Sequence, residues 1–114
     1  ECFVNRDTRL PMMFMDDAIR ATLELMDAPL NSLNYHSNYN LSSMSFSAKE
    51  LADEISSHVD FECTYKPDYR QDIANTWPIS IDDEAARNDW KWEPKFDITK
   101  MTEEMITNLR RLNE

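Results

Sequence analysis

The sequence has 114 residues, of which 41% are hydrophobic, so it has the length of one domain and the composition of a folded protein rather than a disordered tail. Its 22 acidic and 12 basic residues leave a net charge of −10, which repels nucleic-acid phosphates and anionic membrane surfaces, so we expect neither as a partner. It contains no glycine, and the dinucleotide-binding fingerprint and the P-loop both need glycine where the backbone approaches phosphates; we therefore expect this chain alone to bind no nucleotide.

The first third of the sequence predicts two short strands and a helix. Apolar runs at 2–4 and 10–15 have the composition of strands, and Pro11 stands near the start of the second, which is apolar throughout. A helix is expected from Asp16 until Pro29 stops it. Helical spacing predicts that its buried face consists of Ala18, Ile19, Thr22, Leu23 and Met26. We interpret the methionines Met12, Met13, Met15 and Met26 as core residues.

The middle of the sequence predicts a loop, a strand, a helix and another strand. Residues 31–40 are polar and rich in turn formers, and residues 39–47 have the pattern of a short strand. Ser47 and Glu50 form an S-x-x-E capping box, which begins a helix whose buried stripe is Leu51, Ala52, Ile55 and Val59. Residues 61–65 alternate between apolar and polar side chains, which is typical of a half-buried strand.

The last third predicts two helices after an ambiguous segment. Residues 68–78 are compatible with a short helical turn, and Asp82 is expected to cap a helix that runs to Trp90. A last helix is expected after a cap at Asp97 or Thr99, because apolar residues then repeat at helical spacing. They are Ile98, Met101, Met105, Leu109 and Leu112. The pattern as a whole predicts an α/β protein with short strands and about four helices, without the continuous βαβ series of a Rossmann fold.

The acidic pairs at 16–17 and 82–83 have two interpretations. As metal ligands they would need partners, yet the only histidines, His36 and His58, stand at no zinc-binding spacing to a cysteine. Both pairs fall at predicted helix starts, where carboxylates cap the exposed N–H groups. We therefore interpret both pairs as capping residues.

Two residues are candidates for contact with a ligand. Arg9 is either a solvated charge at the mouth of a strand or a guanidinium beside a cleft, where it would bind a carboxylate or phosphate. Trp77 lies outside any helical stripe and is either a packing residue or the wall of a small-ligand site. For Trp90 and Trp92 we expect packing.

Four blocks of the sequence resemble L-threonine 3-dehydrogenases of the short-chain type, which are extended short-chain dehydrogenases related to the nucleotide-sugar epimerases. The blocks are DTRLPMMFMDDAIRATLELMDAP (7–29), YNLSSMSFSAKELADEI (39–55), YKPDYRQDIANTWPISIDDEAARNDWKW (65–92) and FDITKMTEEM (96–105). The resemblance covers nearly the whole chain. It implies the C-terminal substrate-binding lobe of the α/β fold. The NAD-binding Rossmann half, with its glycine-rich loop and catalytic Tyr-x-x-x-Lys, would precede Glu1.

The resemblance also implies a function. The complete enzyme would oxidise L-threonine to 2-amino-3-oxobutanoate with NAD bound by the other half, and we expect this chain to be inactive alone. Trp77 matches the tryptophan that closes on the substrate, and Arg9 matches an arginine beside the active-site cleft. A further set matches a structural pattern: Asp82, Asp83, Ala86, Arg87, Asp89 and Trp90. The implied assembly is a homodimer, mitochondrial as in animals or, alternatively, cytoplasmic as in bacteria.

The sequence departs from the family at two places. Lys91 stands where the family has a glycine between two tryptophans, and a left-handed helix cap there is unfavourable for lysine. Ser42 and Ser43 stand where family members carry small residues, often Ala or Gly. Two alternatives therefore stay open, a truncated non-catalytic paralogue that acts as an interaction module and the lobe of a nucleotide-sugar epimerase.

Overall fold

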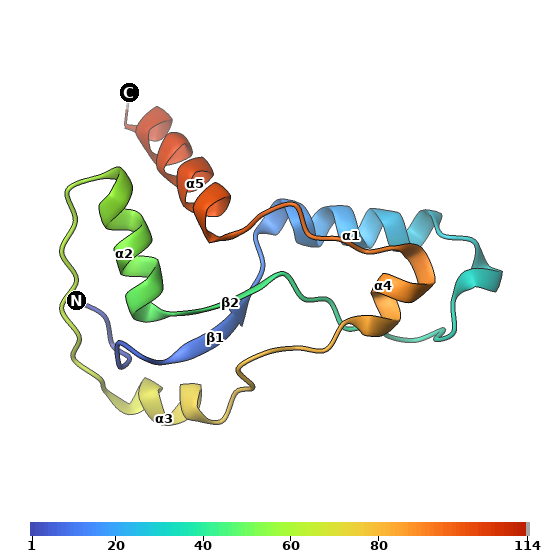
Figure 1. Cartoon of the computed structure of the whole chain (residues 1–114), viewed down its shortest axis with the longest axis horizontal. Coiled ribbons are helices and arrows are strands. Elements are labelled where there is room, and N and C mark those ends of the chain that lie inside the picture. Colours follow the sequence, from blue (N-terminus) through green and yellow to red (C-terminus); the bar gives the residue numbers. More distant parts are fainter. Residues whose placement is uncertain (114) are drawn as a thin grey trace.

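The centre of the fold is an antiparallel pair of strands in a computed structural model that describes residues 1–113 (Figure 1). Strand β1 (Arg9–Met12) pairs with β2 (Met44–Ser47), so that Arg9 lies opposite Ser47 and Met12 lies opposite Met44. Both strands of such a ribbon are edge strands, which is why Pro11 is tolerated within β1 although it has no N–H to donate. With the helices, this pair confirms the predicted α/β class.

Helices make up most of the remaining regular structure. They are α1 (Met15–Asp27), a 3₁₀ turn η1 (Leu30–Ser32), α2 (Ala48–His58), α3 (Tyr69–Asn75), α4 (Glu84–Trp90) and α5 (Ile98–Leu112). The sequence predicts about four helices, and residues 1–113 hold five α-helices. The additional helix is α3, which occupies the ambiguous segment and begins where the Asp68 side chain accepts the N–H of Arg70.

Capping residues set the starts of α2 and α5 as predicted. The capping box of α2 is complete, because Ser47 accepts from the Glu50 N–H and Glu50 accepts from the Ser47 N–H. Asp97 caps α5 by accepting the N–H of Lys100 at 2.9 Å. The start of α4 is one residue later than predicted, since its N-cap is Asp83, while Asp82 accepts the Glu84 N–H at 3.0 Å from the position before.

Four predicted strands are shorter in the structure or do not form, and one of them is the run at 39–47, which forms a strand only at Met44–Ser47. The runs at 2–4 and 61–65 meet in a single parallel bridge between Cys2 and Tyr65, which is too short to make a strand. The predicted strand at 10–15 ends at Met12, because its partner begins opposite that residue at Met44. Met15 instead begins α1, whose first hydrogen bond joins the Ala18 N–H to the Phe14 carbonyl.

The predicted buried face of α1 is exposed. Met15, Ile19, Leu23 and Met26 each expose half of their surface or more. The face that is buried against the rest of the chain carries Asp17 and Ala21. The helical spacing of the apolar residues is correct, but no other element among residues 1–113 covers their face, so the prediction of a methionine-rich core was wrong for this helix.

The overall shape is open, as Figure 1 shows, and it is flat along the direction of view. The radius of gyration is 16.8 Å, whereas a compact domain of this length has about 13 Å. The extents are 50 × 38 × 19 Å, so the thinnest direction is only about two helix diameters deep. The buried apolar core is correspondingly small and consists of Ala21, Phe46, Ala52, Ala86, Trp92 and Met101.

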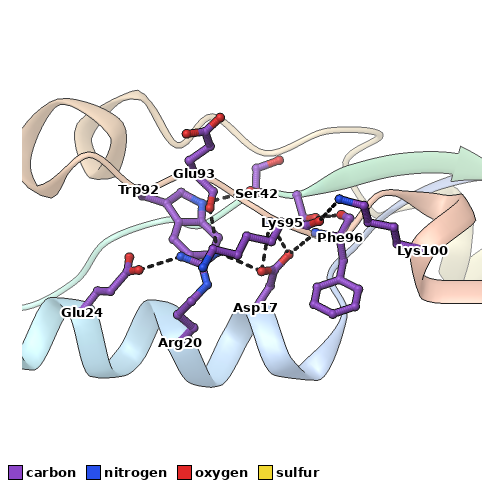
Figure 2. Close-up of polar contacts among 10 residues, drawn as sticks. Asp17, Arg20, Glu24, Ser42, Trp92, Glu93, Lys95, Phe96 and Lys100 are labelled. Atoms are coloured by element: carbon purple, nitrogen blue, oxygen red, sulfur yellow. Dashed lines mark hydrogen bonds and ion pairs between the residues drawn. The ribbon is translucent and has the colours of Figure 1, made fainter. Parts of the chain in front are cut away.

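The carboxylate of Asp17 joins α1 to the segment between α4 and α5. Figure 2 shows its side chain pointing toward Lys95 and Phe96, whose backbone N–H groups donate to it at 3.0–3.1 Å. Arg20 donates to the same carboxylate at 2.9 Å. Burial alone would raise the pKa of Asp17, but these hydrogen bonds, that from Phe96 foremost, outweigh burial and lower the pKa below its ordinary 3.8.

Asp17 therefore corrects the capping interpretation. The N-cap of α1 is Phe14, which makes no side-chain capping bond, and the carboxylate of Asp17 serves a tertiary contact instead. The indole of Trp92 packs beside this contact and is 2% exposed, with its N–H donating to the Ser42 carbonyl at 3.1 Å. The packing role predicted for Trp92 is confirmed, and Trp90 meets the ring of Tyr39 edge-on at 4.7 Å.

Candidate functional site

Arg9 and Trp77, the two candidates from the sequence, line the same open cavity of about 480 Å³. Its wall comes from three segments: the chain that leads into β1, helix α3, and the residues after α3. The lining residues are Asn5, Arg6, Asp7, Thr8, Arg9, Gln71, Ala74, Asn75, Trp77 and Ile79. The fold thus brings together residues 68 positions apart, because α3 lies along the segment that precedes β1.

The indole of Trp77 stands at the edge of this cavity with 56% of its surface exposed. Its position follows from the end of α3, since the Trp77 N–H donates to the Ala74 carbonyl at 3.1 Å and Pro78 prevents the helix from continuing. A large aromatic ring exposed beside a cavity is a surface that a small ligand can cover.

The guanidinium of Arg9 is already engaged within the chain. It donates to the Ser45 carbonyl at 2.6 Å and to both carboxylate oxygens of Glu50 at 2.7 Å. The Ser47 N–H first, and then Arg9, lower the pKa of Glu50, so this carboxylate is ionised at neutral pH. Arg9 therefore ties β1 to the start of α2 and brings little uncompensated charge to the cavity.

Two other polar residues in the cavity wall were not singled out by the sequence. Arg6 is exposed and lies 3.8 Å from the exposed Asp7, which is a loose ion pair. Gln71 is half-buried and accepts hydrogen bonds from the Asn5 N–H at 2.6 Å and from the Thr8 hydroxyl at 3.1 Å. No short motif marks either residue, because each reaches the cavity only through the contact between α3 and the segment before β1.

A second open cavity, of about 540 Å³, lies between the loop that contains Tyr35 and Tyr39 and helix α4. Its carboxylate Asp89 is used internally: it accepts from the Tyr39 hydroxyl at 2.5 Å and from the Asn34 backbone and side chain at 2.9 and 2.7 Å. The bond from Tyr39 is the main cause that lowers the pKa of Asp89. This cavity is thus a place where a loop is fastened to α4.

The residues of this chain do not fit a dinucleotide. The sequence has no glycine, and the sheet formed within residues 1–113 is one antiparallel pair without the parallel strand and helix that cradle a pyrophosphate. In the same part of the chain no group of three or more His, Cys, Asp or Glu residues is arranged to hold a metal ion. Nor is any helix described there long and apolar enough to cross a bilayer.

Comparison with known sequences gives two kinds of relative. The chain is 48% identical over 108 residues to the mitochondrial L-threonine 3-dehydrogenase of Bos taurus, covering 93% of this chain and 29% of that protein. It is 42% identical over 106 residues to an uncharacterised epimerase/dehydratase of Staphylococcus aureus, covering 91% of this chain and 33% of that protein. No family model matches the chain.

Comparison with solved structures agrees with the sequence relatives. A monomeric L-threonine 3-dehydrogenase from a metagenome, in its apo form, is 87% identical and superposes with a TM-score of 0.94. The match covers 99% of this chain and 37% of that structure. The chain therefore spans about a third of the length of the proteins that it matches.

Proposed function

Because the chain has the sequence and fold of the C-terminal portion of L-threonine 3-dehydrogenases and of their epimerase/dehydratase relatives, we propose that it is the substrate-binding portion of an NAD-dependent L-threonine 3-dehydrogenase. The observation that supports this assignment best is the exposed indole of Trp77 beside a cavity, in a chain 87% identical to a threonine dehydrogenase. The dinucleotide is assigned to the other portion of the enzyme.

The proposed reaction converts L-threonine to 2-amino-3-oxobutanoate. A hydride leaves C3 and a proton leaves the C3 hydroxyl; a dinucleotide held by the other portion of the enzyme would supply the hydride acceptor, and the tyrosine of the Tyr-x-x-x-Lys motif in that portion would take the proton. In this chain Trp77 covers the bound amino acid and excludes water, and closure of that kind lowers the barrier by orienting the substrate. Arg9 contributes by holding β1 against Glu50 at the cavity edge.

The test compares two aromatic residues in the complete enzyme. Trp77→Ala is expected to lower kcat/KM for L-threonine by roughly tenfold to a hundredfold, because an aromatic wall of the substrate site is lost. Tyr69→Ala is the matched control, since Tyr69 is an exposed aromatic residue at the start of α3 and lies outside the cavity wall. Equal kcat/KM values for Trp77→Ala and the unmodified enzyme would refute the proposal.

The relatives of the epimerase/dehydratase kind support a second candidate, a lobe that closes over a nucleotide sugar. A thermal-shift experiment on the complete protein distinguishes the two candidates. L-threonine together with NAD should raise the melting temperature under our proposal, whereas a UDP-sugar should raise it under the alternative. The third possibility, a non-catalytic paralogue, predicts a shift with neither ligand.

Assembly and compartment are proposals that rest on the relatives. The family resemblance favours a homodimer. The solved relative that is 87% identical to this chain is monomeric, however, and because of that identity we favour a monomer. Light scattering of the complete protein after gel filtration decides between the two. The bovine and porcine relatives are mitochondrial, so we propose a mitochondrial location, with a cytoplasmic one as the alternative.

A further inference from the structure

Helix α3, which ends two residues before Trp77, is held to the rest of the chain mainly by polar contacts. It has seven residues, and none of them is buried, so apolar packing contributes little to its position. At its start, Arg70 stacks on the ring of Phe3 at 3.5 Å and pairs with Asp68. Near its middle, a single side chain, Gln71, reaches the segment that precedes β1.

The side-chain oxygen of Gln71 accepts two hydrogen bonds from that segment. The Asn5 N–H donates to it at 2.6 Å, and the Thr8 hydroxyl donates to it at 3.1 Å. The amide nitrogen of Gln71 in turn donates to the Asn75 side chain at 2.7 Å, one turn further along α3. One side chain therefore fixes the helix against the other wall of the cavity and also supports the last turn before Trp77.

The end of α3 transmits this position to Trp77 through a short, well-bonded turn. The Thr76 N–H and hydroxyl both reach the Ile73 carbonyl, at 3.0 and 2.7 Å, and the Trp77 N–H reaches the Ala74 carbonyl. The segment that receives Gln71 is itself fixed, because the Lys49 N–H donates to the Arg6 carbonyl and the Ala48 N–H donates to the Thr8 carbonyl. Two residues after Trp77, the Ile79 carbonyl accepts a hydrogen bond from the Ser45 hydroxyl of β2, so the indole lies between this bond and the Gln71 contact.

We propose that Gln71 is a positioning residue for the threonine site: its side-chain oxygen, held by Asn5 and Thr8, sets the distance of the Trp77 indole from the opposite wall of the cavity. This inference rests on the proposed function for its substrate, although the placement of Trp77 can be tested without any activity. Gln71 is expected to act only through Trp77, with no contact to the substrate of its own.

Kinetics of the complete enzyme test the functional part with a double-mutant cycle. Gln71→Met, which keeps the side-chain length without hydrogen bonding, should raise KM for L-threonine about tenfold and leave kcat within about twofold. Gln71→Glu, which keeps the acceptor oxygen, should restore KM to within about threefold of the unmodified value. In a Trp77→Ala background Gln71→Met should add no further loss, since two residues that act as one unit are not additive. Additive losses would overturn the inference.

Fluorine NMR of the complete protein labelled with 5-fluorotryptophan tests the placement directly. Single Trp→Phe variants at positions 77, 90 and 92 identify the resonances of these three tryptophans. Gln71→Met should shift or broaden the Trp77 resonance and leave those of Trp90 and Trp92 in place. An unchanged Trp77 resonance would overturn the inference, and so would an equal shift of all three.

A second variant, and the independence of the NMR result from activity, keep the inference testable. If Gln71→Met fails to fold, Thr8→Val removes one of the two bonds to the same oxygen, and a smaller shift of the Trp77 resonance alone is expected; no shift would overturn the inference. If the complete enzyme does not oxidise threonine, the proposed function fails by itself. The NMR result still decides whether Gln71 positions Trp77.

Discussion

Replacing Asp17 by asparagine tests whether a buried carboxylate, rather than apolar packing, holds α1 to the segment before α5. Asp17→Asn keeps the volume of the side chain and removes its charge. The side chain is fully buried and accepts hydrogen bonds from two backbone N–H groups and from the guanidinium of Arg20 (Figure 2). Arg20 is itself partly exposed and also pairs with Glu24, so its charge stays compensated when that of Asp17 is removed.

The expected loss follows from the contacts of the carboxylate. Hydrogen bonds to a charged group contribute about 1.5–3 kcal/mol each, and asparagine keeps only one acceptor oxygen for the Lys95 and Phe96 N–H groups. Its NH₂ group then faces the guanidinium of Arg20, where a donor meets a donor. Because Arg20 keeps its pair with Glu24, the loss is that of the charge-assisted hydrogen bonds alone, about 2–3 kcal/mol. We expect Asp17→Asn to lower the free energy of unfolding by that amount.

Urea unfolding followed by circular dichroism measures this loss, and Asp16→Asn is the matched control. Asp16 lies in the same first turn of α1 and is exposed, so both variants lose the same favourable interaction with the helix dipole. The control should change the free energy of unfolding by less than about 1 kcal/mol. A loss below about 1 kcal/mol for Asp17→Asn, in a variant with native circular dichroism, would refute the role that we assign to the carboxylate.

The same pair of proteins predicts a dependence on pH. The pKa of Asp17 is lower in the folded state than its ordinary 3.8, so the unfolded chain takes up this proton first as the pH falls. The contribution of Asp17 is therefore complete well above pH 3.8 and is lost as the pH drops through the lowered folded pKa. The difference in unfolding free energy between the unmodified chain and Asp17→Asn should shrink on acidification, while other carboxylates titrate alike in both.

Two further predictions concern the C-terminal end of α4. Lys91→Gly should stabilise the chain by about 1 kcal/mol in urea unfolding, because Lys91 adopts φ 63° and ψ 36° at the left-handed cap, and Lys91→Ala, which keeps the Cβ atom, should give no such gain. Tyr39→Phe should raise the pKa of Asp89 toward 3.8 in an NMR titration, since the bond from the Tyr39 hydroxyl is the largest cause of its lowering; an unchanged pKa would contradict that assignment.

Local chemistry made the starts of α2 and α5 predictable, and the family resemblance indicated one special backbone position. The Ser47–Glu50 capping box and the Asp97 cap form as expected, because each depends only on residues within one turn. The resemblance to a family with glycine at position 91 indicated a left-handed cap there, and Lys91 has a positive φ. Capping bonds within one turn can be predicted without knowing where distant residues lie.

Contacts between segments that are distant in the sequence could not be predicted from sequence patterns. Asp17 looks like a helix-start carboxylate, and only the return of residues 95 and 96 to α1 turns it into a tertiary acceptor. Gln71 carries no motif at all, since its partners Asn5 and Thr8 lie more than sixty positions away. The sequence did indicate Arg9 and Trp77, and they line one cavity, but the engagement of Arg9 by Glu50 follows only from the pairing of β1 with β2.

On α1 the sequence pattern predicts a buried apolar face that is exposed in this chain. Its residues Ile19, Leu23 and Met26 have the spacing of a buried stripe, and yet they lie open in a chain that is wider than a compact domain of its length. Contiguous exposed apolar surface on a soluble protein indicates contact with something else. The chain also spans about a third of the length of its relatives. Under the proposed function, the periodicity of α1 is explained if another portion of the complete enzyme covers this face.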